Sequence, residues 1–344
     1  MALLFAEKFA KYATQADVAS DNSGWVGGNA TNGIETAFGR FGDNCLRIRA
    51  SAGHYTIPWL ALTASDTTII GASVRLGAGL QIEPRTIFAL VDATSAFHWA
   101  VQMSISGFVT VVDSNDMVVA MSAQPLGYGV WHWIEVKATA TGAGNVEVRV
   151  DGVQVINVAG DFLDGTADPL TSLRFGGVFN TEGFHYDELI VMDGTGATFN
   201  DFLGDMRIEA SVVDADGSIV DWTASAGTDV SCVDDALGAY NDDTDYVSSS
   251  TTDQDEYFSH ATVVAPGHTD IIFAGLTALV RDDGANTFRL QVNSGGTIDR
   301  SPADINPSTV YQWSTYVWGS DPDTVAPWVL ADLNAAEFGL RCRP

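Results

Sequence analysis

The chain has 344 residues, 46% of them hydrophobic and 17% charged, so it carries enough apolar side chains to build folded cores. Its formal net charge of −28 excludes binding through nucleic-acid phosphates and attraction to an anionic membrane. The three widely spaced cysteines, Cys45, Cys232 and Cys342, argue against a disulfide framework and against a zinc site.

The first 200 residues read as short strands separated by turn residues, at the spacing of about 8–12 residues that a β-sandwich predicts. In the clearest stretch, residues 145–150, three valines alternate with Glu147 and Arg149. Asp151-Gly152 then predicts a tight type I′ turn before a second strand begins at Val153. The other strands expected here are 3–5, 9–12, 45–49, 68–75, 87–91, 97–103, 108–112, 118–121, 131–137, 172–179 and 184–192.

A turn-rich segment near residues 194–204 predicts a domain boundary, after which a second set of strands begins with Met206–Val212. Residues 271–280 and 288–292 are expected to form a hairpin through a five-residue loop, and further strands are expected at 311–318 and 338–342. Together the patterns predict an all-β protein of two antiparallel, jelly-roll-like β-sandwich domains, residues 1–200 and 201–344.

Residues 1–200 resemble the laminin-G-like and concanavalin A-like jelly-roll domains in three places: the opening segment 3–12, the block 131–155, and the closing strand 184–192. The whole chain is also similar to a group of tailed-bacteriophage virion proteins. That second resemblance rests on Asp193–Gly196, Asn200–Glu209, Asp221–Thr223, Asn241–Ser249 and Leu333–Gly339.

The resemblance to virion proteins implies a tail-fibre, collar or head-decoration component that docks to other virion proteins and forms a homo-oligomer. It places the protein in the virion, which agrees with the lack of a signal-peptide pattern at the N-terminus. No apolar run approaches the roughly 18 residues of a membrane span, so no membrane insertion is expected.

The sequence contains none of the familiar catalytic motifs. Related sandwiches that cleave glycosides carry carboxylates at alternate positions of one strand, and no such run exists here. The nearest acidic pair, Asp187-Glu188, is expected to point to opposite faces of a regular strand. We therefore predict a non-enzymatic structural component of a tailed-phage virion, with binding of a host-surface glycan or receptor as the alternative, and a hydrolase with an unrecognised site as a third hypothesis.

An acidic segment, residues 229–256, is the candidate for cation binding, because it holds nine Asp or Glu residues and no Lys or Arg. Asn241, Asp243 and Asp245 have the i, i+2, i+4 spacing of a calcium loop, but Tyr246 stands where an EF-hand needs glycine, which excludes that motif. A looser Ca²⁺ site would use Asp242, Asp243 and Asp245, and a solvated loop is the alternative. No other cofactor is expected.

Two tryptophans, Trp25 and Trp59, lie near expected loops and are the candidates for stacking on sugar rings. The remaining tryptophans fall in apolar strands, where packing in the core is the usual role. If the glycan-binding alternative holds, we expect these two side chains to carry it.

Overall fold

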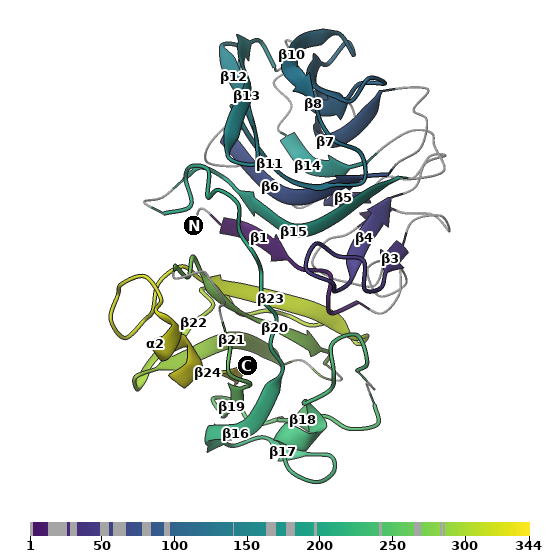
Figure 1. Ribbon diagram of the computed structural model, residues 1–344. Helices are drawn as coiled ribbons and strands as arrows, with labels where there is room; N and C mark the ends of the chain where they lie inside the picture. Colours follow the sequence, from purple (N-terminus) through teal and green to yellow (C-terminus); the bar gives the residue numbers. More distant parts are fainter. Residues whose placement is uncertain are drawn as a thin grey trace. The chain divides into compact units, whose positions relative to one another are not determined.

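The computed structural model of the chain is almost entirely β (Figure 1). It describes residues 3–12, 26–27, 33–48, 55–57, 67–77, 84–92, 97–139, 141–162, 170–176, 183–195, 198–240, 243–264, 270–282, 284 and 286–344. The predicted all-β class, with antiparallel sheets arranged as sandwiches, is confirmed. No helix in the described ranges has the length and apolar character needed to cross a membrane.

The chain divides into two compact units, which are described separately. Unit 1 comprises Met1–Ala19 and Gly24–Ile208, and unit 2 comprises Ser20–Ser23 and Glu209–Pro344. The division thus falls at residue 208, whereas the sequence analysis placed it at residue 200.

Two antiparallel sheets form unit 1. Sheet A runs in the order β13 (Val153–Gly160), β12 (Gly144–Val150), β11 (Trp131–Thr139), β6 (Thr67–Leu76), β15 (Phe184–Met192), β4 (Cys45–Ile48) and β3 (Gly33–Glu35), and β1 (Leu3–Glu7) also pairs with β15. Sheet B runs in the order β10 (Val118–Pro125), β9 (Phe108–Asp113), β8 (Phe97–Met103), β7 (Arg85–Asp92), β14 (Leu170–Phe175), β5 (Tyr55–Ile57) and β2 (Val26–Gly27).

The predicted hairpin of residues 145–155 is confirmed as β12 and β13. Burial alternates along β12 as the valine pattern requires. Asp151 and Gly152 take φ values of 50° and 79°, the two left-handed positions of a type I′ turn.

Aromatic side chains fix which face of each sheet is interior. Phe88 of sheet B lies 5.6 Å from Phe175 of the same sheet and 6.2 Å from Tyr186 of sheet A, between ring centroids. The Tyr186 hydroxyl also donates a hydrogen bond of 2.9 Å to the carbonyl of Ile87. Since side chains alternate along a strand, Ala89 and Arg174, the neighbours of Phe88 and Phe175, face away from the core.

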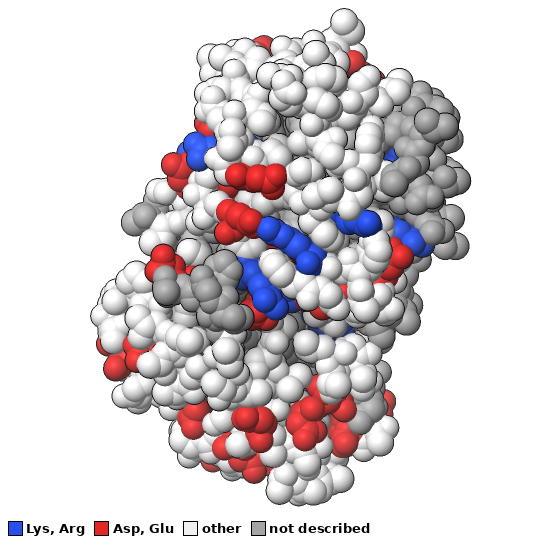
Figure 2. Space-filling model, viewed as in Figure 1, with Lys and Arg blue, Asp and Glu red and all other residues white. Residues whose placement is uncertain are grey.

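Unit 2 is built on one larger sheet, in the order β16 (Val213–Val220), β19 (Asp255–His260), β24 (Glu337–Arg343), β21 (Thr287–Ser294) and β22 (Thr297–Arg300). Two smaller sheets pair β17 (Thr223–Ala224) with β18 (Val247–Ser248), and β20 (Ala274–Val280) with β23 (Gln312–Trp318). The described part also holds the 3-10 turn η1 (Val230–Cys232) and the short helix α2 (Leu330–Ala335). The face of unit 2 seen in Figure 2 is rich in Asp and Glu side chains.

Two sequence predictions for this unit are wrong. Strands 271–280 and 288–292 do not pair as a hairpin, because β20 pairs with β23 while β21 pairs with β22 and β24. Residues 206–212 form no strand; the first strand of unit 2 is β16.

Residues 200–208 belong to unit 1 because polar side chains of β11 and of the turn before β4 hold them. The buried carboxylate of Glu135 accepts hydrogen bonds from the backbone N–H groups of Leu203 (2.9 Å) and Gly204 (3.0 Å). Arg40 forms a bidentate ion pair with Asp205, at 2.5 and 2.6 Å. These contacts carry the chain along the outer face of sheet A as far as Ile208.

Candidate metal centre

A β-bulge in β15 brings two adjacent carboxylates together. The pairing of β15 with β6 shifts register between Asp187 and Ile190, and Glu188 has φ of 54°. A bulge with a residue in the left-handed region re-aims its side chain. The prediction that Asp187 and Glu188 point to opposite faces is therefore wrong, since it assumed a regular strand.

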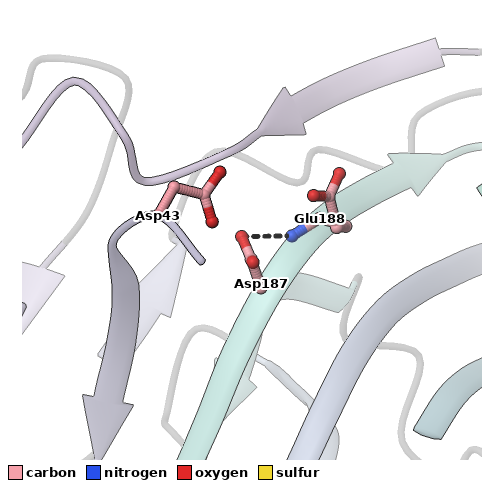
Figure 3. Close-up of side chains that lie close together, drawn as sticks. All are labelled: Asp43, Asp187 and Glu188. Atoms are coloured by element: carbon pink, nitrogen blue, oxygen red, sulfur yellow. Dashed lines mark hydrogen bonds between the residues drawn. The ribbon is translucent and has the colours of Figure 1, made fainter. Parts of the chain in front are cut away.

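A third carboxylate, that of Asp43, reaches the same place from the turn before β4 (Figure 3). One ligand oxygen from each of Asp43, Asp187 and Glu188 lies within 4.8 Å of the other two. Asp187 and Glu188 are fully buried, and the Asp43 side chain is 26% exposed. Segments distant in the sequence thus supply one buried acidic cluster, which we call the carboxylate centre.

Lys8, directly after β1, places its ammonium group in this centre. Its Nζ lies 2.8 Å from Asp43 Oδ2 and 2.6 Å from Glu188 Oε1. Burial by itself would lower the pKa of Lys8, but the carboxylates of Glu188 and Asp43 outweigh it and raise that pKa. Three carboxylates against one ammonium group leave two negative charges.

The hydrogen bonds of the centre leave one oxygen without a donor. Asp187 accepts from the backbone N–H of Arg40 (2.9 Å) and of Glu188 (3.0 Å), and Glu188 accepts from the N–H of Ile208. Asp43 Oδ1, by contrast, is buried and has no hydrogen-bond partner in the described part of the chain. An uncompensated buried oxygen is costly and calls for a cation or a proton.

The raised pKa values of two of these carboxyl groups also indicate that the centre needs a cation or a proton. Burial, followed by the charges of Glu188 and Asp43, raises the pKa of Asp187 to about 8. Burial also raises the pKa of Glu188, although Lys8 partly offsets it. At neutral pH the centre without a bound cation therefore retains a proton.

Gly39 leaves the space that the centre needs. A Cβ at this position would lie 2.2 Å from Asp43 Oδ1 and 2.8 Å from Asp187 Oδ2. Glycine is thus required by close approach of the backbone to the carboxylates.

The donor set fits a hard divalent cation. All three ligands are carboxylates, which suit Ca²⁺ or Mg²⁺ and do not suit Zn²⁺ or copper, whose sites use His and Cys. Ca²⁺ tolerates irregular geometry and a coordination shell of 6–8 oxygens, to which backbone carbonyls and water also contribute.

The residues predicted from sequence do not lie in this centre. Trp25, Trp59 and Asp242 fall outside the described residues. Asp243 is exposed and forms an ion pair of 2.7 Å with Arg281, while Asp245 has one buried oxygen without a partner. No group of three potential ligands forms around them among the described residues, and the Ca²⁺ site at these positions stays a prediction.

The carboxylate centre was missed because its signal in the sequence is slight. The Asp-Glu pair of the closing strand was noticed, but Asp43 lies in an unremarkable turn, and nothing local indicates the bulge.

A second feature of unit 1 is the outer face of sheet B. Cα partners across four strands place Arg174, Ala89, Ala100 and Val112 in one row. The last three form a small apolar cluster separate from the main core. Burial lowers the pKa of Arg174 with no carboxylate to offset it, and the Arg174 Nε has no hydrogen-bond partner among the described residues.

No family model matches the chain, and no curated protein matches it. Parts of solved structures are similar to it. The cellulose-induced protein Cip1 gives a TM-score of 0.39 at 12% identity, over 55% of this chain and 96% of that one. The alginate lyase Aly36B, as a mutant with alginate trisaccharide, gives a TM-score of 0.41 at 13% identity, over 55% of this chain and 97% of that one. The endo-β-1,4-glucuronan lyase of the fungus Trichoderma reesei gives a TM-score of 0.35 at 12% identity, over 55% of this chain and 90% of that one.

These findings correct two predictions. The chain was expected to be a structural component of a tailed-phage virion and not an enzyme. The structures found include two polysaccharide lyases, a sialidase and a cellulose-induced protein, and nothing found points to a virion. The jelly-roll-like sandwich part of the resemblance is supported. Homo-oligomer formation, binding to other virion proteins or a host-surface glycan, and location in the virion stay predictions. At scores this low the similarities carry no argument about chemistry, which has to come from the geometry.

Proposed function

We propose that unit 1 binds one divalent cation, Ca²⁺, at Asp43, Asp187 and Glu188. The observation that carries this proposal is the buried Asp43 Oδ1, which has no hydrogen-bond donor among the described residues and belongs to a centre where three carboxylates meet one ammonium group, a balance of two negative charges. A divalent cation neutralises both charges and supplies the missing partner. A single proton on Asp187 removes only one of them.

The bound cation acts as a cross-link. Asp43 belongs to the turn that precedes β4, whereas Asp187 and Glu188 belong to β15, the strand that closes sheet A. Lys8 ties the end of β1 to the same place, and the N–H of Ile208 ties the segment that leaves unit 1. Ligation therefore fastens the turn before β4 to β15, the last strand of the unit, in the way a cross-link between distant segments stabilises a fold.

Thermal unfolding in EDTA and in Ca²⁺ tests this function. At a Ca²⁺ concentration of about 100 times Kd, linkage predicts stabilisation of about 2.7 kcal/mol. Asp187→Asn and Asp43→Asn should abolish this stabilisation by Ca²⁺. Asp201→Asn is the matched control, because Asp201 is an exposed acid of unit 1 that pairs with Lys137 instead. The proposal is overturned if Ca²⁺ does not stabilise the wild-type protein. It is also overturned if Ca²⁺ stabilises both Asp187→Asn and Asp43→Asn as much as the wild type.

A second candidate function is binding of an acidic polysaccharide on the outer face of sheet B. It is favoured by Arg174, a half-buried guanidinium group whose Nε has no hydrogen-bond partner among the described residues of a strongly acidic chain. Guanidinium groups bind carboxylates through paired N–H donors.

Affinity electrophoresis in gels containing alginate, polygalacturonate or neutral dextran tests this second function. Retardation is expected with the uronate polymers alone, and Arg174→Gln should remove it without changing the melting temperature. Arg149→Gln is the control, since Arg149 already pairs with Glu147 at 2.8 Å. Equal retardation by dextran, or unchanged retardation of the Arg174 variant, contradicts the assignment.

A further inference from the structure

Unit 2 contains a buried carboxyl group of which one oxygen has no hydrogen-bond donor among the described residues. Glu256, in β19, is fully buried between its Cα partners Val220 of β16 and Leu340 of β24. Its Oε2 accepts a hydrogen bond of 2.9 Å from the N–H of Trp222. Its Oε1 is buried and has no hydrogen-bond donor in the described ranges.

A second carboxyl group lies against that oxygen. Asp229, directly before η1, is 9% exposed, and its Oδ2 is likewise buried without a donor. The Asp229 side chain is within hydrogen-bonding reach of Glu256. Two carboxylates cannot donate to one another, so neither group can satisfy the buried oxygen of the other unless one of them carries a proton.

The charged groups around the pair offer no compensation. From β16, Asp216 adds a carboxylate that accepts from a backbone N–H of η1, and Asp221 follows at the end of the same strand. Arg341, on β24, forms an ion pair of 2.7 Å with Asp255. Within the described residues, no ion pair joins a Lys or Arg to Glu256, and the charged groups nearest to it on β16 are carboxylates.

We infer that Asp229 and Glu256 share one proton between Glu256 Oε1 and Asp229 Oδ2, and that this proton holds the turn containing η1 against β19. Two ionised carboxylates in contact, away from water, repel strongly, and one proton converts the repulsion into a short hydrogen bond. A metal ion is a poorer fit, because no third carboxylate, His or Cys joins the pair among the described residues.

The inference makes the attachment of this turn dependent on pH. Burial is the main cause of a Glu256 pKa raised from 4.5 to about 7, with the Asp229 charge adding to it. A group with a raised acid pKa binds its proton more tightly when folded. Its contribution is therefore complete at low pH and is lost as the pH rises from about 4.5 through 7. Above that range Glu256 loses its proton, and repulsion between the two carboxyl groups favours release of residues 221–233 from the strand.

Hydrogen exchange of peptides covering residues 221–233, in the full-length protein, tests the inference. After correction for the chemical exchange rate, protection should fall about tenfold or more between pH 5.5 and 8.5. Glu256→Gln and Asp229→Asn should each give protection that is flat with pH, since an amide donates without titrating. Asp255→Asn is the control, because Asp255 lies in the same strand but pairs with Arg341; this variant should keep the wild-type response.

Three results overturn the inference: wild-type protection that does not change with pH, a wild-type response in both amide variants, or protection at pH 8.5 that Ca²⁺ restores in the wild type but not in Glu256→Gln. The last result would identify a metal site in place of a shared proton. Either amide variant alone suffices if the other fails to fold, which circular dichroism shows.

Discussion

The raised pKa of Asp187 makes the stability of unit 1 depend on pH when no cation is bound. A carboxyl group whose pKa is higher in the folded state holds its proton more tightly there. The stabilisation is complete below the ordinary pKa of 3.8 and is lost as the pH rises through about 8. Removing Ca²⁺ with EDTA and raising the pH from 6 to 9 should therefore destabilise unit 1.

The size of the effect follows from the two pKa values. One proton contributes about 1.4 kcal/mol per pH unit between them. The whole stabilisation by this proton is on the order of 5 kcal/mol, and about 2–3 kcal/mol of it is lost between pH 6 and pH 8. Burial lowers the pKa of the neighbouring His185, which moves its titration away from this range.

Hydrogen exchange resolved by peptide measures this loss in unit 1 alone. Peptides from β15 should lose protection between pH 6 and pH 9 in EDTA, and saturating Ca²⁺ should remove the loss. Asp187→Asn should show no such pH dependence, although loss of one backbone hydrogen bond lowers its stability by about 1 kcal/mol at every pH. Identical pH profiles for the wild type and Asp187→Asn would refute the reasoning.

Three further predictions concern the same unit. Binding of Ca²⁺ near pH 7 should release about one proton and near pH 9 almost none, which calorimetry in buffers of different ionisation enthalpy measures. Gly39→Ala should weaken Ca²⁺ binding and cost about 1–3 kcal/mol in urea unfolding, because its Cβ meets Asp43, whereas Gly142→Ala, with nothing within 4 Å, should not. Glu135→Gln should increase hydrogen exchange in residues 200–208, since their N–H donors lose a charged acceptor worth about 1–3 kcal/mol.

Local patterns in the sequence were reliable where the interactions are themselves local. The β12–β13 hairpin was predicted because alternating valines and an Asp-Gly turn lie within a dozen residues of one another. The partner of β20 was not predictable in this way. Its apolar residues are compatible with several strands, and its pairing with the aromatic strand β23 is decided by packing in unit 2.

The carboxylate centre depends on contacts that no local pattern encodes. Glu188 adopts a left-handed conformation in a strand whose sequence reads as regular, and its carboxylate is held by Lys8 and by the N–H of Ile208, both distant in the chain. Asp43 reaches the site only because the turn around Gly39 packs on Asp187. The acidic loop near Asp243 looked more promising in sequence, but there Arg281 is the partner.

The most direct test of a cation in unit 1 is an anomalous difference map from crystals of the full-length protein grown with Ca²⁺ or Mn²⁺. The account predicts a peak bounded by Asp43, Asp187 and Glu188, with Asp43 Oδ1 among the ligands, and no peak there in Asp187→Asn. A map without a peak at the carboxylate centre, with Lys8 Nζ still paired to Asp43 and Glu188, would contradict it.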